Sequence, residues 1–271
     1  MKKLIKFWTA LWYILQRPAL LNYILKDEAL LGRQFKRTFP EVQLKEIDAF
    51  NWPEAAQITV RPYAFLSGSS MLTDFAFLQL LCKKFSVETY FEIGTWRGES
   101  AANVAPYVQN VYTLNLPDEN LKALGQSKAY IDSHRFFSRE VKNVTHLFGD
   151  SAHFDFRPYE QVCDLVFIDG DHSTEAVLRD TQTALKLRKS KTSILVWHDA
   201  KSDAEYPRYE VLLGIYKALP KEMHAHVYLV KHALCAVYLP QVEAAEFISL
   251  NALPSKTFEV TLHAKKLNES V

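Results

Sequence analysis

Short apolar runs alternate with amphipathic stretches of helical length between residues 89 and 238, and this alternation constrains the fold more than any other feature of the sequence. The runs that we interpret as strands are residues 89–93, 110–114, 144–148, 164–168 and 193–197. The stretches between them include one predicted helix from about Glu99 and another over residues 173–189. Because parallel strands need long crossover connections, the pattern predicts an α/β fold with a doubly wound, mostly parallel sheet.

The two last apolar runs, residues 226–230 and 234–238, are separated by only three residues. So short a connection favours a hairpin, and we expect it to form an antiparallel C-terminal edge on the parallel sheet. We therefore expect one domain over residues 61–240, an N-terminal helical extension over 1–60 and a C-terminal extension over 241–271. Within the domain, a buried helix is predicted from about Ser70, with Ser69 or Ser70 as its cap.

Residues 1–17 place apolar and basic side chains on one predicted helix. The apolar residues recur at helical spacing, with three lysines nearby: Leu4, Phe7, Trp8, Leu11, Trp12 and Leu15, beside Lys2, Lys3 and Lys6. The run is too short to span a bilayer, and no small-residue cleavage site follows it. Two interpretations stay open: a helix that docks on its own domain or on a second subunit of a homodimer, and a helix that lies on an anionic membrane.

Charge and cysteine content exclude other classes of protein. The 32 basic and 31 acidic residues give a formal net charge of +1, so there is no general electrostatic reason to bind nucleic acid. The cysteines Cys82, Cys163 and Cys235 lie far apart in the sequence, which fits neither a zinc site nor a disulfide framework. A reducing, cytoplasmic location fits this composition best.

The loop after the first predicted strand indicates the kind of ligand. It reads Glu92-Ile-Gly94-Thr-Trp-Arg-Gly98, so its two glycines are four residues apart. Dinucleotide enzymes use G-x-G-x-x-G, which places a pyrophosphate at the helix N-terminus. A carboxylate at Glu92 would repel a pyrophosphate but favour a cation. The loop therefore favours a nucleoside with an amino-acid ammonium group over a nicotinamide dinucleotide.

Two motifs in this chain resemble a known family. The segment Phe91 to Ser100 resembles the first motif of class I S-adenosylmethionine-dependent methyltransferases. The segment Asp164 to Asp180, followed by Val196-Trp-His-Asp199, is similar to the methyltransferase-24 family, which is related to catechol and antibiotic-sugar O-methyltransferases. The resemblance covers roughly residues 65–240 and implies a Rossmann-like fold. It also implies methyl transfer from S-adenosylmethionine to a hydroxyl on a sugar or small metabolite.

The resemblance also implies a cofactor site. The residues that match the family's cofactor-binding positions are Glu92, Gly94, Thr95, Gly98 and Ser100 for the methionine portion, Asn115 for the ribose, and Asp150 and Ser151 for the adenine edge. Asn115 departs from the acid usual at its position, which removes charge assistance from the ribose contact. Asp118 or Glu119 could substitute for it. Lys189 to Ser193 also differ from the Pro-Gly-Gly of relatives, in a turn away from the site.

Three acids follow two neighbouring predicted strands. Asp169 and Asp171 come after residues 164–168, and Asp199 comes after residues 193–197, so all three should converge at one rim of the sheet. Converging carboxylates favour a hard cation such as Mg²⁺. By resemblance, Asp169 and Asp199 are the expected metal ligands, His198 is a candidate third ligand or base, and Asp171 or His172 would remove the acceptor proton.

Each of these residues also has a purely structural interpretation. Asp171 or Ser173 could cap the 173–189 helix, and His198 could be a hydrogen-bonded core histidine. Residues 67–70 could be a lid over the cofactor or a plain loop. Two other functions stay open as well: a non-catalytic binding or scaffold domain on a methyltransferase fold, and a nicotinamide-dependent oxidoreductase.

Overall fold

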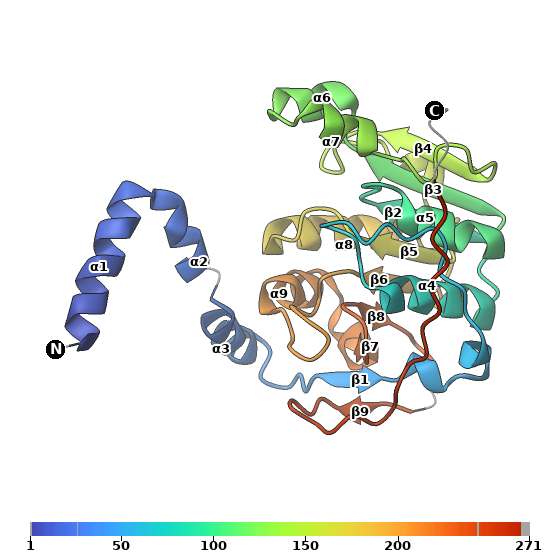
Figure 1. The fold of residues 1–271 in the computed structure, drawn as a ribbon. Helices are drawn as coiled ribbons and strands as arrows, with labels where there is room; N and C mark the ends of the chain where they lie inside the picture. Colours follow the sequence, from blue (N-terminus) through green and yellow to red (C-terminus); the bar gives the residue numbers. More distant parts are fainter. Residues whose placement is uncertain (1, 26, 243, 267–271) are drawn as a thin grey trace.

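The computed structural model describes residues 2–25, 27–242 and 244–266. Over these residues the strands form one nine-stranded sheet in the order β4-β3-β2-β5-β6-β8-β7-β1-β9 (Figure 1). Five parallel strands form one side of the sheet, with β4 at its edge: β2 (Thr89–Ile93), β3 (Asn110–Asn115), β4 (Val144–Phe148), β5 (Leu165–Ile168) and β6 (Ile194–Trp197). They lie where the alternating pattern predicts them, and the doubly wound α/β fold is confirmed.

The predicted hairpin forms from β7 (Val227–Val230) and β8 (Ala236–Tyr238). Strand β8 inserts antiparallel between β6 and β7. The sheet continues beyond the hairpin through β1 (Lys45–Ile47), which pairs parallel with β7, and β9 (Glu246–Phe247), which pairs antiparallel with β1. Both short strands come from segments that the pattern predicts to be extensions, and they place the hairpin inside the sheet rather than at its edge.

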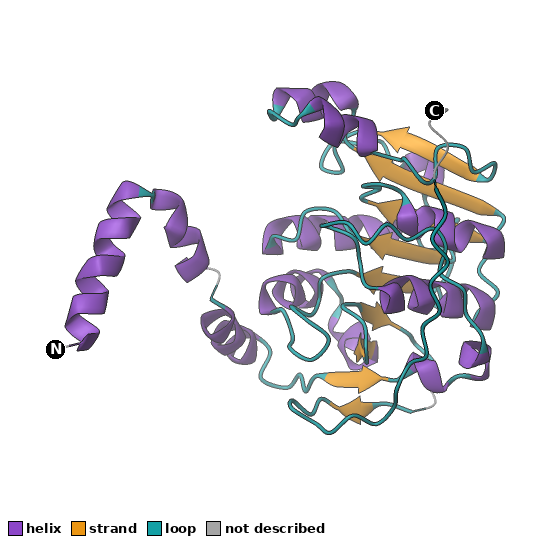
Figure 2. Cartoon of the chain, viewed as in Figure 1, coloured by secondary structure: helices purple, strands orange, loops and turns teal. Residues whose placement is uncertain are grey.

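Helices cover both faces of the sheet (Figure 2). One face packs against α3 (Glu28–Thr38), α8 (Thr174–Leu187) and α9 (Tyr209–Ala218), and the other packs against α4 (Leu72–Lys84) and α5 (Glu99–Val104). Side chains that alternate along β2 follow this division, because Phe91 and Ile93 belong to the first core and Tyr90 to the second. The two short helices α6 (Asp118–Ala123) and α7 (Lys128–Ser133) follow β3.

The N-terminal extension divides into two parts. Helices α1 (Lys2–Gln16) and α2 (Leu21–Leu25) stand apart from the sheet in Figure 1. Helix α3 instead packs on α9, where the Phe35 ring lies 5.2 Å from that of Tyr216. The Glu28 carboxylate, at the start of α3, accepts a hydrogen bond of 2.6 Å from the backbone N–H of Tyr209. Residues from Glu28 onward are therefore fixed to the sheet domain.

Candidate active site

The glycine loop between β2 and α5 has its shape imposed by neighbouring loops. Gly94 has φ 102°, and a Cβ placed there would lie 2.0 Å from the backbone oxygen of Asp169. Gly98 has φ 76°, and its Cβ would lie 2.0 Å from Ser138 Oγ. Only glycine tolerates both the positive φ and the contact. The loop after β5, which holds Asp169, therefore lies directly against the glycine loop.

A cavity of about 1040 Å³ opens at the carboxyl ends of β2, β3 and β5. Its size is that of a site for a cofactor together with a small substrate. Seven of the eight residues predicted to hold the cofactor line it: Gly94, Thr95, Gly98, Ser100, Asn115, Asp150 and Ser151. Asp169, Asp171 and His172 line the same cavity. The structure thus brings the predicted cofactor positions and three predicted chemical groups into one space.

Glu92, the eighth predicted cofactor residue, does not line the cavity. Its side chain is on the Tyr90 face of β2 and is fully buried. The carboxylate accepts hydrogen bonds of 2.8 Å from the Tyr90 hydroxyl and from Thr113 Oγ1. Burial raises the pKa of Glu92 to about 7, although hydrogen bonds from Ser100, Thr113 and Tyr90 oppose this rise. Glu92 ties β2, β3 and α5 together beneath the glycine loop.

Asn115, the residue that the resemblance implies for the ribose, is the last residue of β3. Its amide is half-buried and donates a hydrogen bond of 3.3 Å to the carbonyl of Leu116. Of the two acids that could substitute for it, Glu119 lines the cavity. Asp118 forms an ion pair of 3.5 Å with Arg135. Glu119 is therefore the better placed of the two.

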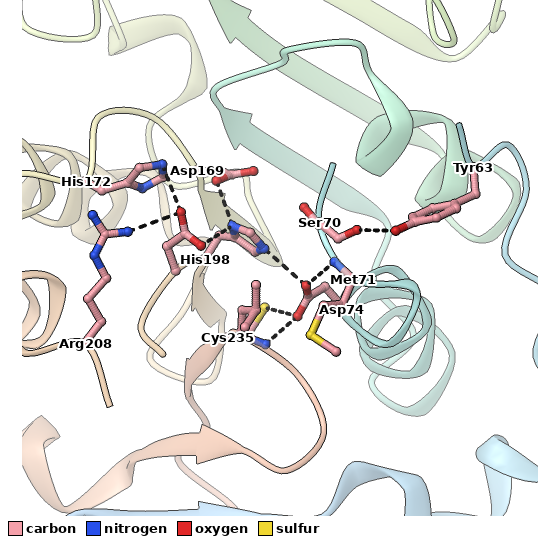
Figure 3. Close-up of polar contacts among 11 residues, drawn as sticks. Tyr63, Ser70, Met71, Asp74, Asp169, His172, His198, Arg208 and Cys235 are labelled. Carbon is pink, nitrogen blue, oxygen red and sulfur yellow. Dashed lines mark hydrogen bonds and ion pairs between the residues drawn. The ribbon is translucent and has the colours of Figure 1, made fainter. Parts of the chain in front are cut away.

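The acids after β5 and β6 converge around a histidine (Figure 3). His198 Nδ1 lies 3.1 Å from Asp169 Oδ1 and 3.4 Å from Asp199 Oδ1. Its other ring nitrogen, Nε2, lies 3.2 Å from Asp74 Oδ2. Since carboxylates only accept hydrogen bonds, a ring that donates from both nitrogens is an imidazolium. His198 is thus a buried cation among three carboxylates.

Asp74, which the motif analysis missed, anchors this cluster. It lies in the first turn of α4 and is fully buried. Its carboxylate accepts 2.7 Å hydrogen bonds from the backbone N–H groups of Met71 and Leu234, as well as the bond from His198. The α4 helix begins after Met71, so the predicted serine cap is wrong, because Asp74 accepts the N–H at this end itself.

The arrangement does not fit the metal ion that the family resemblance implies at Asp169 and Asp199. Burial alone would lower the pKa of His198, but the carboxylates of Asp169 and Asp74 outweigh it and raise that pKa well above its ordinary value. The N–H of this cation points between Asp169 and Asp199, where a divalent ion would have to bind. Across the described residues no group of three or more His, Cys, Asp or Glu side chains is arranged to hold a metal ion.

His172 lies at the rim of the cavity, on the loop between β5 and α8. Its Nε2 is 3.1 Å from Asp199 Oδ2, and the same oxygen is 3.4 Å from Arg208 Nη1. Asp199 therefore orients the His172 ring, and Arg208 orients Asp199. Arg208 precedes α9 and was not predicted, because no motif marks it.

Asp171 and Ser173 together form the start of α8. Ser173 is the N-cap residue, and its hydroxyl accepts a hydrogen bond of 3.4 Å from the Ala176 N–H. Asp171 Oδ1 accepts a hydrogen bond of 2.7 Å from the Ser173 N–H. The capping interpretation therefore holds for Ser173, while Asp171 stabilises the turn before it and also lines the cavity.

The loop of residues 67–70 borders the cavity and is fastened to the glycine loop. The Arg97 guanidinium donates to Ser69 Oγ at 2.6 Å and to the Ser67 carbonyl at 3.1 Å. Ser69 Oγ donates in turn to Glu99 at 2.9 Å. Arg97 and Glu99 were not predicted as site residues. They could have been predicted only from their contacts with residues 67–70, which are about thirty positions away in the sequence.

Comparisons with known proteins agree with the sequence motifs. Residues 91–200 match the family model Methyltransf_24, described as a methyltransferase domain. No curated protein matches the chain. The described helices include none that is long and apolar enough to cross a membrane.

Solved structures resemble the chain at low identity. The O-methyltransferase from Bacillus cereus in complex with S-adenosylhomocysteine is 17% identical, with 64% of this chain and 84% of that chain covered and a TM-score of 0.43. TomG from Streptomyces achromogenes, an O-methyltransferase involved in tomaymycin synthesis, is 16% identical, with 63% and 81% covered and a TM-score of 0.42. YcgJ from Bacillus subtilis is 17% identical, with 46% and 52% covered and a TM-score of 0.33.

The chain spans only about half the length of YcgJ and of the Bacillus halodurans protein BH2331, 52% and 50% respectively. Because all these TM-scores lie below 0.5, the solved structures transfer no function to this chain. The family match covers the glycine loop and the acids after β5 and β6, which are the segments that build the cavity. Residues 91–200, which build this cavity, are therefore similar to a methyltransferase domain.

Proposed function

We propose that the protein methylates a hydroxyl group of a sugar or another small metabolite, with His172 as the general base. The observation that supports this proposal is the position of His172, which borders the cavity and is oriented by Asp199 at 3.1 Å. A histidine held by a carboxylate can take a proton from a hydroxyl near neutral pH.

The cavity suits the methyl donor. S-adenosylmethionine carries an ammonium and a sulfonium, and carboxylates of Glu119, Asp150, Asp169 and Asp171 line the cavity. Gly94 and Thr95 would hold the methionine end, Asn115 the ribose and Asp150 the adenine edge. The bound cofactor supplies an electrophilic methyl group.

Side chains of the protein would remove the proton of the acceptor hydroxyl. If Nε2–H of His172 donates to Asp199, Nδ1 is the nitrogen that can accept. Nδ1 would then accept the proton of the acceptor hydroxyl as that oxygen takes the methyl group from the sulfonium, whose C–S bond would break with its electron pair left on the sulfur. Asp199, paired with Arg208, stabilises the imidazolium that results. A base of this kind contributes on the order of 10²- to 10⁴-fold to the rate.

We assign no step to Mg²⁺. The two carboxylates that would hold it both face Nδ1–H of His198, which occupies the position that a metal ion would need. Methyl transfer should therefore proceed equally in EDTA and in added Mg²⁺. A loss of activity in EDTA that Mg²⁺ restores would show that His198 gives way to a metal ion and would overturn this assignment.

The first experiment is calorimetric titration of the full chain with S-adenosylhomocysteine, followed by a screen of hydroxylated acceptors for its release. Binding is expected, and a titration with NADH should be flat. His172→Ala should lower kcat about 100-fold or more, and leave the affinity for S-adenosylhomocysteine unchanged. The matched control is His263→Ala, at an exposed histidine outside the sheet.

The two parts of the proposal fail differently. If the folded protein binds no S-adenosylhomocysteine, methyl transfer is refuted and a scaffold role on this fold takes its place. If the wild type transfers methyl groups and His172→Ala is as active as His263→Ala, the base is another residue and only the role of His172 is refuted.

A further inference from the structure

Helix α1 buries no side chain against the described part of the chain. None of its residues is buried, although most are large and apolar. Leu4 is 63% exposed, Trp8 59% and Leu15 73%. Figure 1 shows the helix projecting from the sheet domain, beyond the point where α3 is fixed to α9. An apolar surface of this size, left in water, indicates a contact that lies outside the chain itself.

The side chains of α1 separate into two faces. Leu4, Trp8, Leu11 and Leu15 follow one another at intervals of three and four residues and therefore share one side of the helix. A narrower opposite side carries Lys2, Lys6, Thr9 and Gln16, with Tyr13 among them. The helix has 15 residues, so it cannot cross a bilayer, but its two faces suit a position along a bilayer surface.

Charge identifies the kind of surface. Residues 1–26 contain five basic residues and no Asp or Glu. The other 245 residues contain 27 basic and 31 acidic residues, a net charge of −4. An anionic surface would attract the first segment and repel the rest. A second copy of α1 would bring like charges together, which disfavours self-association through this helix.

The aromatic residues of α1 also favour a lipid surface as its partner. Trp8, Trp12 and Tyr13 are each more than half exposed on two turns of helix. Their rings have an apolar body and a polar N–H or O–H, and such side chains concentrate at the headgroup level of a bilayer. A binding site on a folded protein would require pockets for these rings, whereas a lipid surface accommodates them without a defined partner.

We propose that α1 binds the surface of an anionic lipid bilayer and attaches the sheet domain to it. The apolar face enters the boundary between headgroups and acyl chains, and the lysines contact anionic headgroups. Helix α3, which follows α1 and α2, is attached to the sheet domain, because it packs on α9 and the Glu28 carboxylate accepts a hydrogen bond from Tyr209. This proposal stands whether or not the chain methylates a hydroxyl.

The test is flotation of the full-length protein with vesicles of neutral phosphatidylcholine and with vesicles containing about 30% phosphatidylglycerol. Binding to the anionic vesicles should be at least 10-fold stronger, and it should weaken as the salt concentration rises. The double variant Trp8→Ser/Leu11→Ser should lose at least 10-fold of this binding. Thr9→Ser/Gln16→Ser is the matched control on the polar face and should bind as the wild type does.

Thermal unfolding of each variant is the control for an intact sheet domain. We expect an unchanged melting temperature, because no residue of α1 is buried. Absence of flotation with anionic vesicles would overturn the proposal. So would equal binding of the two double variants. If light scattering shows a dimer that Trp8→Ser/Leu11→Ser dissociates, and the wild type does not float, the occupant of the apolar face is a second copy of the chain.

Discussion

The Glu92→Gln substitution replaces a buried, titrating carboxyl by an amide of the same shape and should change how the stability of the protein depends on pH. Glu92 is fully buried, and burial raises its pKa to about 7 from an ordinary value of 4.5. A folded-state pKa above the unfolded value means that the stability contributed by the protonated carboxyl is complete below pH 4.5. It is lost as the pH rises to 7.

The size of the effect follows from the two pKa values. Between pH 5 and pH 8, the wild type should lose about 2.5 kcal/mol of its free energy of unfolding through this one group. The glutamine variant does not titrate and should not show this loss. Absolute stability is not the quantity to compare, because the amide must also rearrange the hydrogen bonds from Tyr90 and Thr113.

The assay is urea unfolding followed by tryptophan fluorescence at pH 5, 6, 7 and 8. The difference in unfolding free energy between Glu92→Gln and the wild type should shift in favour of the variant as the pH rises. Glu160→Gln, at an exposed glutamate, is the control and should run parallel to the wild type. A Glu92→Gln curve that is also parallel would mean that Glu92 is ionised throughout, and the reasoning from burial would be refuted.

Two further substitutions test the supports of the site by their effect on unfolding. Asp74→Asn removes one of the carboxylates that hold the buried His198 cation and should lower the free energy of unfolding by about 3–5 kcal/mol, measured by urea unfolding. A decrease below about 1 kcal/mol would contradict a charged His198. Gly94→Ala forces a Cβ to within 2.0 Å of the Asp169 backbone at positive φ, so we expect loss of soluble protein or a marked fall in melting temperature. The control is Gly125→Ala, where the added Cβ meets open space, and it should lower the melting temperature far less.

The central strands could be predicted because their residues alone specify them. Runs such as residues 165–168 and 194–197 are apolar without interruption, as strands buried on both faces must be. Strands β1 and β9 have only three and two residues, and their backbone partners lie far away in the sequence. No local pattern distinguishes so short a run from irregular chain.

The candidate site was predictable where it follows the strand ends. Asp169, His172 and Asp199 meet because β5 and β6 are parallel neighbours. Asp74 and Arg208 were missed because they come from α4 and from the segment before α9, and tertiary packing alone brings them to His198 and Asp199. The side-chain direction of Glu92 could have been predicted, because side chains alternate along β2 and Glu92 therefore shares a face with the buried Tyr90 rather than with Ile93.

The pairing of β1 with β7 and β9 has a consequence for the order of folding. It joins Lys45 to Tyr228 and Phe247, so this side of the sheet cannot close until Phe247 has been synthesised. Contacts of such high sequence separation form late, because the entropy of closing a long loop must be offset first. During synthesis the apolar face of α1 leaves the ribosome before any strand of the sheet exists. A nascent chain would therefore be able to meet a lipid surface before the domain behind it has folded.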